Sequence, residues 1–242
     1  MIPPFKEGKN SNYCLGIDGC AGGWLAVCVE NGDFKDAQAF FLPNLVELRT
    51  FAFSFDTEIV IDIPIGLEND KPSRICDIKG RKYLGVRSST IFSPPCKDSL
   101  LAEDYTSARN INLRRTGVSI SKQSWFLFSK ILEAQEEVLN GIELKEGHPE
   151  CSFAAFLGNS PIKDKKKSLK GILKRVKCVT EIGFQLDKLT LSLPDRLSAK
   201  IDDLLDAAIL SWTATRIRND AGFCFYDEMA NVNNPSKGVI YV

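Results

Sequence analysis

The chain has 242 residues, of which 44% are hydrophobic, so it can bury a substantial core in one large domain or two small ones. Lys and Arg together number 31, and so do Asp and Glu. A net charge of zero argues against a histone-like binder of nucleic acid, but it does not exclude a local basic groove.

Eight scattered cysteines form no C-x-x-C pair, and the chain has one histidine, which argues against a zinc knuckle. A chain this rich in core residues does not need a disulfide scaffold, so we expect reduced cysteines in a cytoplasmic protein. Residues 1–12 lack the pattern of a signal peptide, and no apolar stretch is long enough to span a membrane. We expect residues 1–12 to be a flexible leader, and we expect no membrane partner.

The beginning of the chain predicts strands over 13–17, 23–30 and 37–42, joined as an antiparallel meander by tight turns such as Asn31-Gly32. Asn44 is positioned to cap a short helix. The segment "IVIDIPIGL" is apolar on both faces, which is typical of an interior parallel strand that ends at Pro64. The predicted order is therefore β-β-β-α-β.

A mostly helical, charged stretch follows, interrupted by the loop "SSTIFSPPC". It is too long for a simple crossover, so we interpret residues 70–140, approximately, as a helical insertion. Extended structure resumes near residue 141, and a short helix before Pro161 precedes a run over 163–177 with eight Lys or Arg against one Asp. An amphipathic helix over 202–219 and an edge strand over 238–242 complete the prediction.

Two acidic residues lie at the ends of apolar runs. Asp18 precedes a glycine-rich turn, where the backbone is open to a metal or a phosphate, although the pattern taken alone favours a plain turn. Asp62 interrupts a strand that should be buried on both faces. It must therefore be paired with an arginine, protonated or bound to a cation.

Further acids follow later in the chain. Glu150 comes after His148 and Pro149, where His148 could cap a helix, bond Glu150 or contact a substrate phosphate. Asp203 and Asp206 share one side of the last helix, although acids in a first helical turn also serve as dipole partners. If the fold gathers these carboxylates, they form a site for hard cations.

The ordered blocks "GIDGCAGGW", "IDIPIGL", "CDIKGRKYLGVRSSTIF", "EGHPECSF", "KKKSLKGILKR" and "DDLLDAAILSWTA" resemble the predicted RNase H-like nuclease family known as domain of unknown function 429. The resemblance covers residues 13–218, approximately. It implies a single α/β domain over 13–242, with an RNase H-like mixed five-stranded sheet flanked by helices and with the helical insertion.

In that superfamily an acid ends the first strand, a second lies on the fourth strand, and one or two more open the last helix. By position, these resemble Asp18, Asp62, and Asp203 with Asp206, and the resolvase spacing D-x-x-D-A is matched by 203–207. Glu150 belongs to a block characteristic of this family, as a metal ligand or as a substrate contact.

The resemblance implies a metal-dependent nuclease that hydrolyses phosphodiester bonds of DNA or RNA with two Mg²⁺ (or Mn²⁺) ions. Asp18, Asp62, Asp203 and Asp206 would be the metal ligands, and these four and Glu150 the catalytic residues. Because basic and polar groups grip phosphate, the predicted substrate-binding residues are Arg74, Arg81, Arg87, Ser88, His148, Lys166, Lys167 and Arg175. For the lysines of the basic run over 163–177, the alternative is that they form a solvated helix face and bind no substrate.

Two other functions stay open at this point. An actin- or sugar-kinase-like phosphotransferase shares the β-β-β-α-β unit and an Asp-Gly turn near phosphate, although such proteins need two such domains. The second alternative is a protein that has the RNase H-like fold and binds nucleic acid but has lost catalytic activity.

Overall fold

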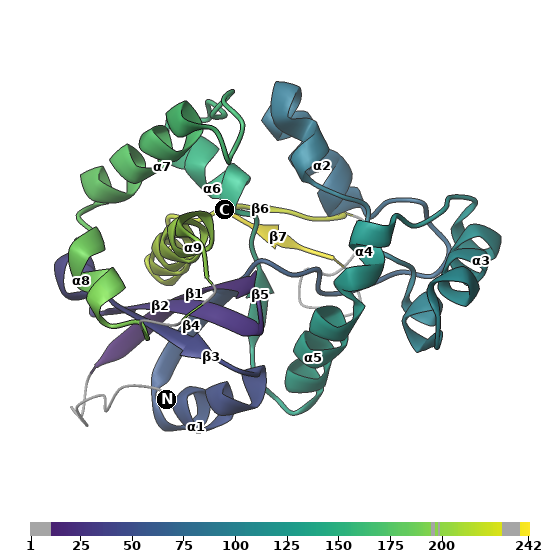
Figure 1. The fold of residues 1–242 in the computed structure, drawn as a ribbon, viewed down its shortest axis with the longest axis horizontal. Coiled ribbons are helices and arrows are strands. Elements are labelled where there is room, and N and C mark those ends of the chain that lie inside the picture. The colour runs from purple at the N-terminus through teal and green to yellow at the C-terminus, as the bar shows by residue number, and fades with distance from the viewer. Residues whose placement is uncertain (1–10, 195–196, 198, 229–237) are drawn as a thin grey trace.

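The computed structural model describes residues 11–194, 197, 199–228 and 238–242. Its centre is a mixed five-stranded sheet in the order β3-β2-β1-β4-β5, flanked by helices (Figure 1). β2 pairs antiparallel with β1 and β3, whereas β4 pairs parallel with β1 and β5. The predicted α/β fold class is therefore confirmed. The strands are β1 (Asn12–Cys20), β2 (Gly23–Glu30), β3 (Gln38–Leu42), β4 (Asp56–Ile61) and β5 (Leu144–Glu146).

Most of the predicted leader lies outside the described residues, because the first described residue is Ser11. Asn12, which we assigned to the leader, already opens β1 and pairs with Asp56.

β1 is buried on both faces because each face has its own hydrophobic cluster. Tyr13, Leu15 and Ile17 pack with helices α1 (Leu48–Ser54) and α5 (Phe128–Leu139). Cys14 packs on the other face with α9 (Ile201–Arg218). Alternating side chains point to opposite faces of a strand, so β1 anchors both layers.

α9 lies directly against β1, and one glycine allows this approach. A Cβ on Gly16 would come within 2.1 Å of the Ala207 carbonyl oxygen. Twelve of the helix's residues are buried, so α9 is enclosed on most sides. We predicted an amphipathic helix with one exposed face, and this was wrong, because neighbouring elements cover α9 on several sides.

The connection between β2 and β3 is longer than the predicted tight turn. Asn31 and Gly32 do turn the chain with φ of 51° and 74°. A 3₁₀ helix, η1 (Phe34–Asp36), then precedes β3. After β3, Asn44 occupies the cap position of η2 (Leu45–Glu47) without a side-chain hydrogen bond to the helix.

β4 ends at Ile61, earlier than the predicted strand. Pro64 has no backbone N–H, and Gly66 turns the chain with a φ of 73°. Asp62 therefore lies just beyond the strand, where its N–H still donates to the Ile17 carbonyl oxygen at 2.9 Å.

A helical region connects β4 to β5 and extends beyond one side of the sheet (Figure 1), as the sequence predicted. The last helical part of this region is divided at Leu127 into α4 and α5. The elements before α5 are α2 (Ile75–Leu84), η3 (Gly85–Thr90), η4 (Lys97–Leu101), α3 (Tyr105–Thr116) and α4 (Lys122–Phe126).

The C-terminal half supplies the layer over the other face of the sheet. Its helices before α9 are α6 (Pro149–Phe156), α7 (Leu169–Ile182) and α8 (Leu186–Leu191). The predicted last strand is β7 (Ile240–Tyr241), which pairs with β6 (Cys224–Phe225) in a separate two-stranded sheet. All eight cysteines are free and seven are buried. Among the described helices, none has the length and apolar character needed to cross a bilayer.

Candidate metal centre

Three acids from separate parts of the chain meet at one edge of the sheet. Asp18 lies near the end of β1, Asp62 follows β4, and Asp206 lies on α9. One carboxylate oxygen from each lies within 4.8 Å of the others. The parallel pairing of β1 and β4 brings their carboxyl ends together, and the contact of α9 with β1 at Gly16 adds Asp206.

Burial raises the pKa of all three carboxyl groups. The pKa of Asp18 is raised well above its ordinary value by burial and then by Asp206 and Asp62. Burial raises the pKa of Asp62 to about 6 and that of Asp206 to about 7, although Lys166 opposes both shifts. Three carboxylates this close repel one another, so the cluster favours protons or a cation.

Lys166 supplies one positive charge to this cluster. Its ammonium contacts the Asp206 carboxylate and lies 3.8 Å from that of Asp202. Burial lowers the pKa of Lys166, but the attraction of Asp206 and Asp18 outweighs it and leaves the pKa raised. The lysine is therefore charged and partly neutralises the acids.

Asp18 and Asp62 line a cavity of about 580 Å³, whereas Asp206 is not part of its lining. The lining combines acids, lysines and residues of the helical region, so charges of both signs line one cavity. The lining residues are Asp18, Gly19, Cys20, Ala21, Asp62, Ile63, Ser89, Thr90, Phe92, Gln123, Leu127, Lys130, His148, Lys166, Lys167, Lys200, Asp202 and Asp203.

Asp203 lies in the cavity wall but outside the three-acid cluster. Its side chain accepts from the Lys200 N–H at 2.8 Å and caps the start of α9. Asp203 therefore does act at the start of the helix, as the alternative of a helix-dipole partner predicted. The neighbouring Asp202 also lines the cavity, and we did not predict it. Its position four residues before Asp206 was the available signal.

Glu150 is also absent from the three-acid cluster. It lies in the first turn of α6, where its carboxylate contacts Arg175 and lies 3.7 Å from the Arg87 guanidinium. Arg175 is 1% exposed and also donates to the Gly171 carbonyl oxygen. Both arginines thus serve a buried carboxylate, and neither lines the cavity.

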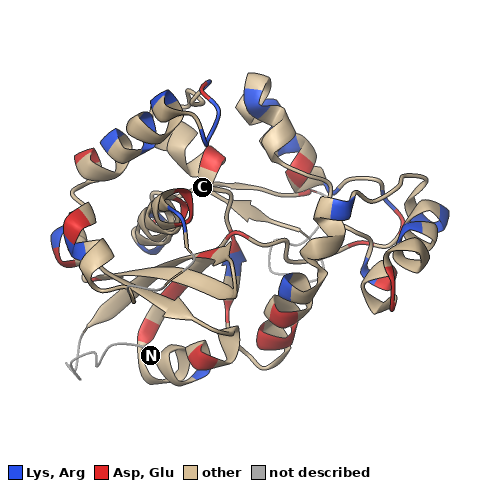
Figure 2. Cartoon of the chain, in the orientation of Figure 1, with Lys and Arg blue, Asp and Glu red and all other residues tan. Residues whose placement is uncertain are grey.

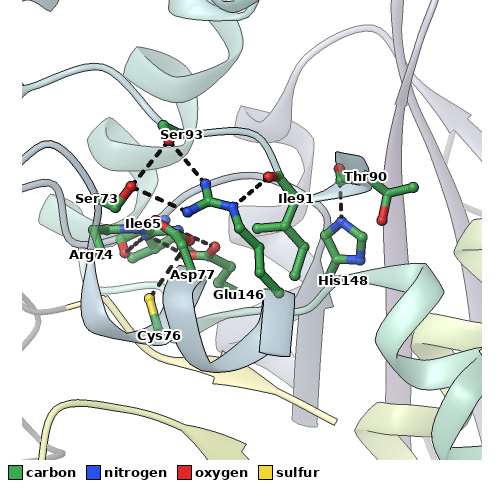
Figure 3. A network of polar contacts seen from close by, with 11 residues as sticks. Ile65, Ser73, Arg74, Cys76, Asp77, Thr90, Ile91, Ser93, Glu146 and His148 are labelled. Carbon is green, nitrogen blue, oxygen red and sulfur yellow. Dashed lines mark hydrogen bonds and ion pairs between the residues drawn. The ribbon is translucent and has the colours of Figure 1, made fainter. Parts of the chain in front are cut away.

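His148 does line the cavity. Its Nε2 lies 3.3 Å from the Thr90 carbonyl oxygen (Figure 3), so this nitrogen carries the proton. Burial lowers the pKa of His148, which favours the neutral imidazole near pH 7. The histidine thereby fastens the end of η3 to the start of α6.

Two more of the predicted substrate contacts lie in a polar network behind the cavity wall. Arg74 forms buried ion pairs with Asp77 and Glu146 (Figure 3). Arg81 donates to the Ile91 carbonyl oxygen and to the Ser93 hydroxyl. These contacts hold the loop in place, and neither arginine is part of the cavity lining.

Of the three remaining predicted substrate contacts, two line the cavity and one does not. Lys166 and Lys167 line the cavity, whereas Ser88 does not, although its neighbours Ser89 and Thr90 do. Basic residues continue along α7 and the segment before it (Figure 2). We also missed Lys130 and Lys200, because isolated lysines in charged segments give no sequence signal.

The donor set of the cluster fits a hard divalent cation. Carboxylate oxygens are the ligands that Mg²⁺ and Mn²⁺ prefer. The Oδ1 atom of Asp206 is buried and has no hydrogen-bond partner among the described residues. An unpartnered buried oxygen beside two other carboxylates is a suitable metal ligand.

The fold and the site define a mixed-sheet α/β protein with a buried carboxylate cluster that is compatible with a metal ion. The family described as "Protein of unknown function (DUF429)" matches residues 16–231, and the chain belongs to this family. The family membership predicted from the sequence is thus confirmed, and the family's description names no activity. Among the curated proteins and the solved structures, no significant match is found.

Proposed function

We propose that this protein is a metal-dependent nuclease with an RNase H-like fold. The observation that carries the proposal is the convergence of Asp18, Asp62 and Asp206 within 4.8 Å at the edge of the sheet. The strand order β3-β2-β1-β4-β5 supports it, because it is consistent with the RNase H-like arrangement. Asp18 and Asp206 lie on the elements that carry ligands in that arrangement, and Asp62 directly follows the third such element, β4.

Asp18, whose pKa responds to both Asp62 and Asp206, would be shared between two Mg²⁺ or Mn²⁺ ions. Asp62 would be a further ligand of one ion. Asp206, with Asp203 nearby, would be a further ligand of the other. When bound, such ions generate a nucleophile from water and stabilise the leaving oxygen of a phosphodiester.

The lysines give the chain a means of holding a polyanionic substrate. Lys167 and Lys200 are exposed, line the cavity, and have no ion pair among the described residues. Lys130 lines the same cavity and lies over the Trp24 ring, with 4.0 Å between Nζ and the ring centroid. Ammonium groups at these positions can contact the phosphates on either side of a scissile bond.

The test is cleavage of single-stranded DNA, RNA, duplex DNA and branched DNA with Mg²⁺ or Mn²⁺. We expect the wild type to cut at least one of these, and Asp18→Asn and Asp62→Asn to abolish cutting while remaining folded by circular dichroism. Asp187→Asn, at an exposed position of α8, is the matched control and should cut normally. Absence of cutting by the wild type on every substrate, or normal cutting by Asp18→Asn, would contradict the proposal.

A further inference from the structure

Part of the cavity lining has no role in the proposed cleavage chemistry, and it forms a second wall beside the carboxylates. One wall comes from β1, β4 and α9, which carry the acids. The other comes from the helical region and contains Thr90, Phe92, Gln123 and Leu127. A substrate whose phosphate lies at the acids can therefore contact this second wall with its remaining groups.

Phe92 is an aromatic side chain on this wall, and it has no aromatic partner among the described residues. It is partly buried and lines the cavity. It is not among the residues that pack with the three hydrophobic clusters of the described chain. No described aromatic ring or cation lies against it, so a face of the ring is available to a ligand.

The backbone on both sides of Phe92 is fixed. Arg81 donates to the Ile91 carbonyl oxygen at 3.0 Å and to the Ser93 hydroxyl at 2.9 Å. Ile91 is buried, and Ser93 also contacts Ser73 at 3.2 Å (Figure 3). The loop therefore presents the Phe92 ring at a defined place, and a preorganised ring loses little entropy when a ligand stacks on it.

Polar side chains on the same wall are available to form hydrogen bonds with a ligand. Gln123 is exposed, and its amide makes no hydrogen bond within the described part of the chain. An amide offers both donors and an acceptor, as the edge of a nucleobase requires. Exposed Ser89 adds a hydroxyl to the same lining.

The size of the cavity restricts what can enter. Its volume of about 580 Å³ lies within the range of small-molecule sites, about 300–1,000 Å³. A single nucleotide with its base unstacked belongs to this size class. In a duplex the bases are stacked and paired, so no base face is available for an aromatic side chain to stack on.

We propose that this wall is a base-binding subsite, with Phe92 stacking on one unpaired base and Gln123 contacting the edge of that base. The inference rests on the proposed function and deepens it, because it assigns single-stranded nucleic acid as the substrate class. Stacking on an aromatic ring tolerates every base, so the subsite selects an unpaired strand without selecting its sequence.

The test is the binding of a short fluorescein-labelled oligothymidylate, measured by fluorescence anisotropy with Ca²⁺ in place of Mg²⁺. An unlabelled duplex of mixed sequence and thymidine monophosphate serve as competitors. We expect the full chain to prefer the single strand to the duplex. Phe92→Ala should weaken single-strand binding by about 5- to 100-fold, and Phe92→Trp should restore it. Gln123→Ala should weaken it less.

Phe126→Ala is the matched control, because this exposed phenylalanine of α4 does not line the cavity. It should bind the oligonucleotide as the wild type does. Competition by the monophosphate that depends on Phe92 would show that one nucleotide is sufficient. Equal affinity for duplex and single strand, loss of binding in both Phe92 variants, unchanged binding by Phe92→Ala, or no binding by the wild type would overturn the subsite.

These outcomes are separate from those of the cleavage assay. Strand binding that depends on Phe92, in a protein that never cuts, would refute the nuclease and leave the subsite standing. Cutting by the wild type and by Phe92→Ala with equal KM would refute the subsite and leave the nuclease standing.

Discussion

The ammonium of Lys166 contacts the carboxylate of Asp206 inside a cluster that has the donor atoms of a metal site. The Asp206 side chain is 4% exposed and that of Lys166 is 32% exposed. The lysine lies on the segment before α7, so it reaches the cluster from the side open to the cavity. An ion that binds Asp206 must compete with this internal cation.

Removing Lys166 should therefore strengthen metal binding. We expect Lys166→Met to raise the affinity for Mn²⁺ by about tenfold or more, since a positive charge next to a binding site opposes a second one. Isothermal titration calorimetry measures the affinity. Lys165→Met, an exposed neighbour with no described ion pair, is the control and should behave as wild type. Weaker binding by Lys166→Met would show that the lysine supports the ion.

Metal affinity should increase with pH. The pKa values of Asp62 and Asp206 are raised to about 6 and about 7, chiefly by burial. Below these values a cation must displace protons, and above them it does not. We expect Mn²⁺ affinity to rise as the pH increases through about 6 to 7. Titrations in buffers of different ionisation enthalpy should show proton release at the lower end. An affinity independent of pH would contradict the raised values.

The same shifts predict that the cluster destabilises the metal-free protein at higher pH. A carboxyl group whose pKa is raised by folding contributes most stability below its unfolded pKa, and that contribution is lost as the pH rises through its folded pKa. For this cluster the loss extends from about pH 4 to about pH 7. Metal-free wild type should therefore become less stable over this range.

Asp18→Asn removes one of these charges and should stabilise the metal-free protein above about pH 7 by about 1–3 kcal/mol. Thermal unfolding with a chelator present measures the change. Mn²⁺ should raise the unfolding temperature of the wild type and not that of the variant. A variant less stable than the wild type above pH 7 would show that the charge of Asp18 is paired.

Arg175 should affect stability rather than substrate binding. Arg175→Met leaves the buried Glu150 without its closest partner, so we expect a loss of about 3–5 kcal/mol in the free energy of unfolding. Urea unfolding measures it. Lys167→Met, at an exposed cavity position, should leave stability unchanged and weaken oligonucleotide binding. Full stability in Arg175→Met would contradict the structural role.

The sequence was most informative where burial is expensive. Asp62 interrupts a run of apolar β-branched residues, so the sequence alone indicates that this acid needs a proton, a cation or an ionic partner. Asp18, which precedes a glycine-rich turn, gave no such indication without the family resemblance. The first three strands and the helical region were predictable from turn residues and apolar periodicity. The apolar pattern predicted that β4 is a parallel strand, but it did not identify β1 as the neighbour whose pairing brings the acids together.

The partners of the basic residues could not be predicted. Arg74, Arg81 and Arg175 look as suitable for phosphate as Lys167 does, because a sequence gives the charge and not the neighbour. Tertiary packing instead placed Glu146 beside Arg74 and Glu150 beside Arg175. Phe92 gave no signal either, since an aromatic residue in a Ser- and Pro-rich loop is compatible with burial or exposure.

The most direct measurement is the anomalous scattering of a crystal soaked in Mn²⁺. The account predicts a strong peak bound by Asp18, Asp62 and Asp206, with the ammonium of Lys166 displaced from Asp206. A map without manganese at these carboxylates, and with Lys166 still in contact with Asp206, would contradict the metal centre.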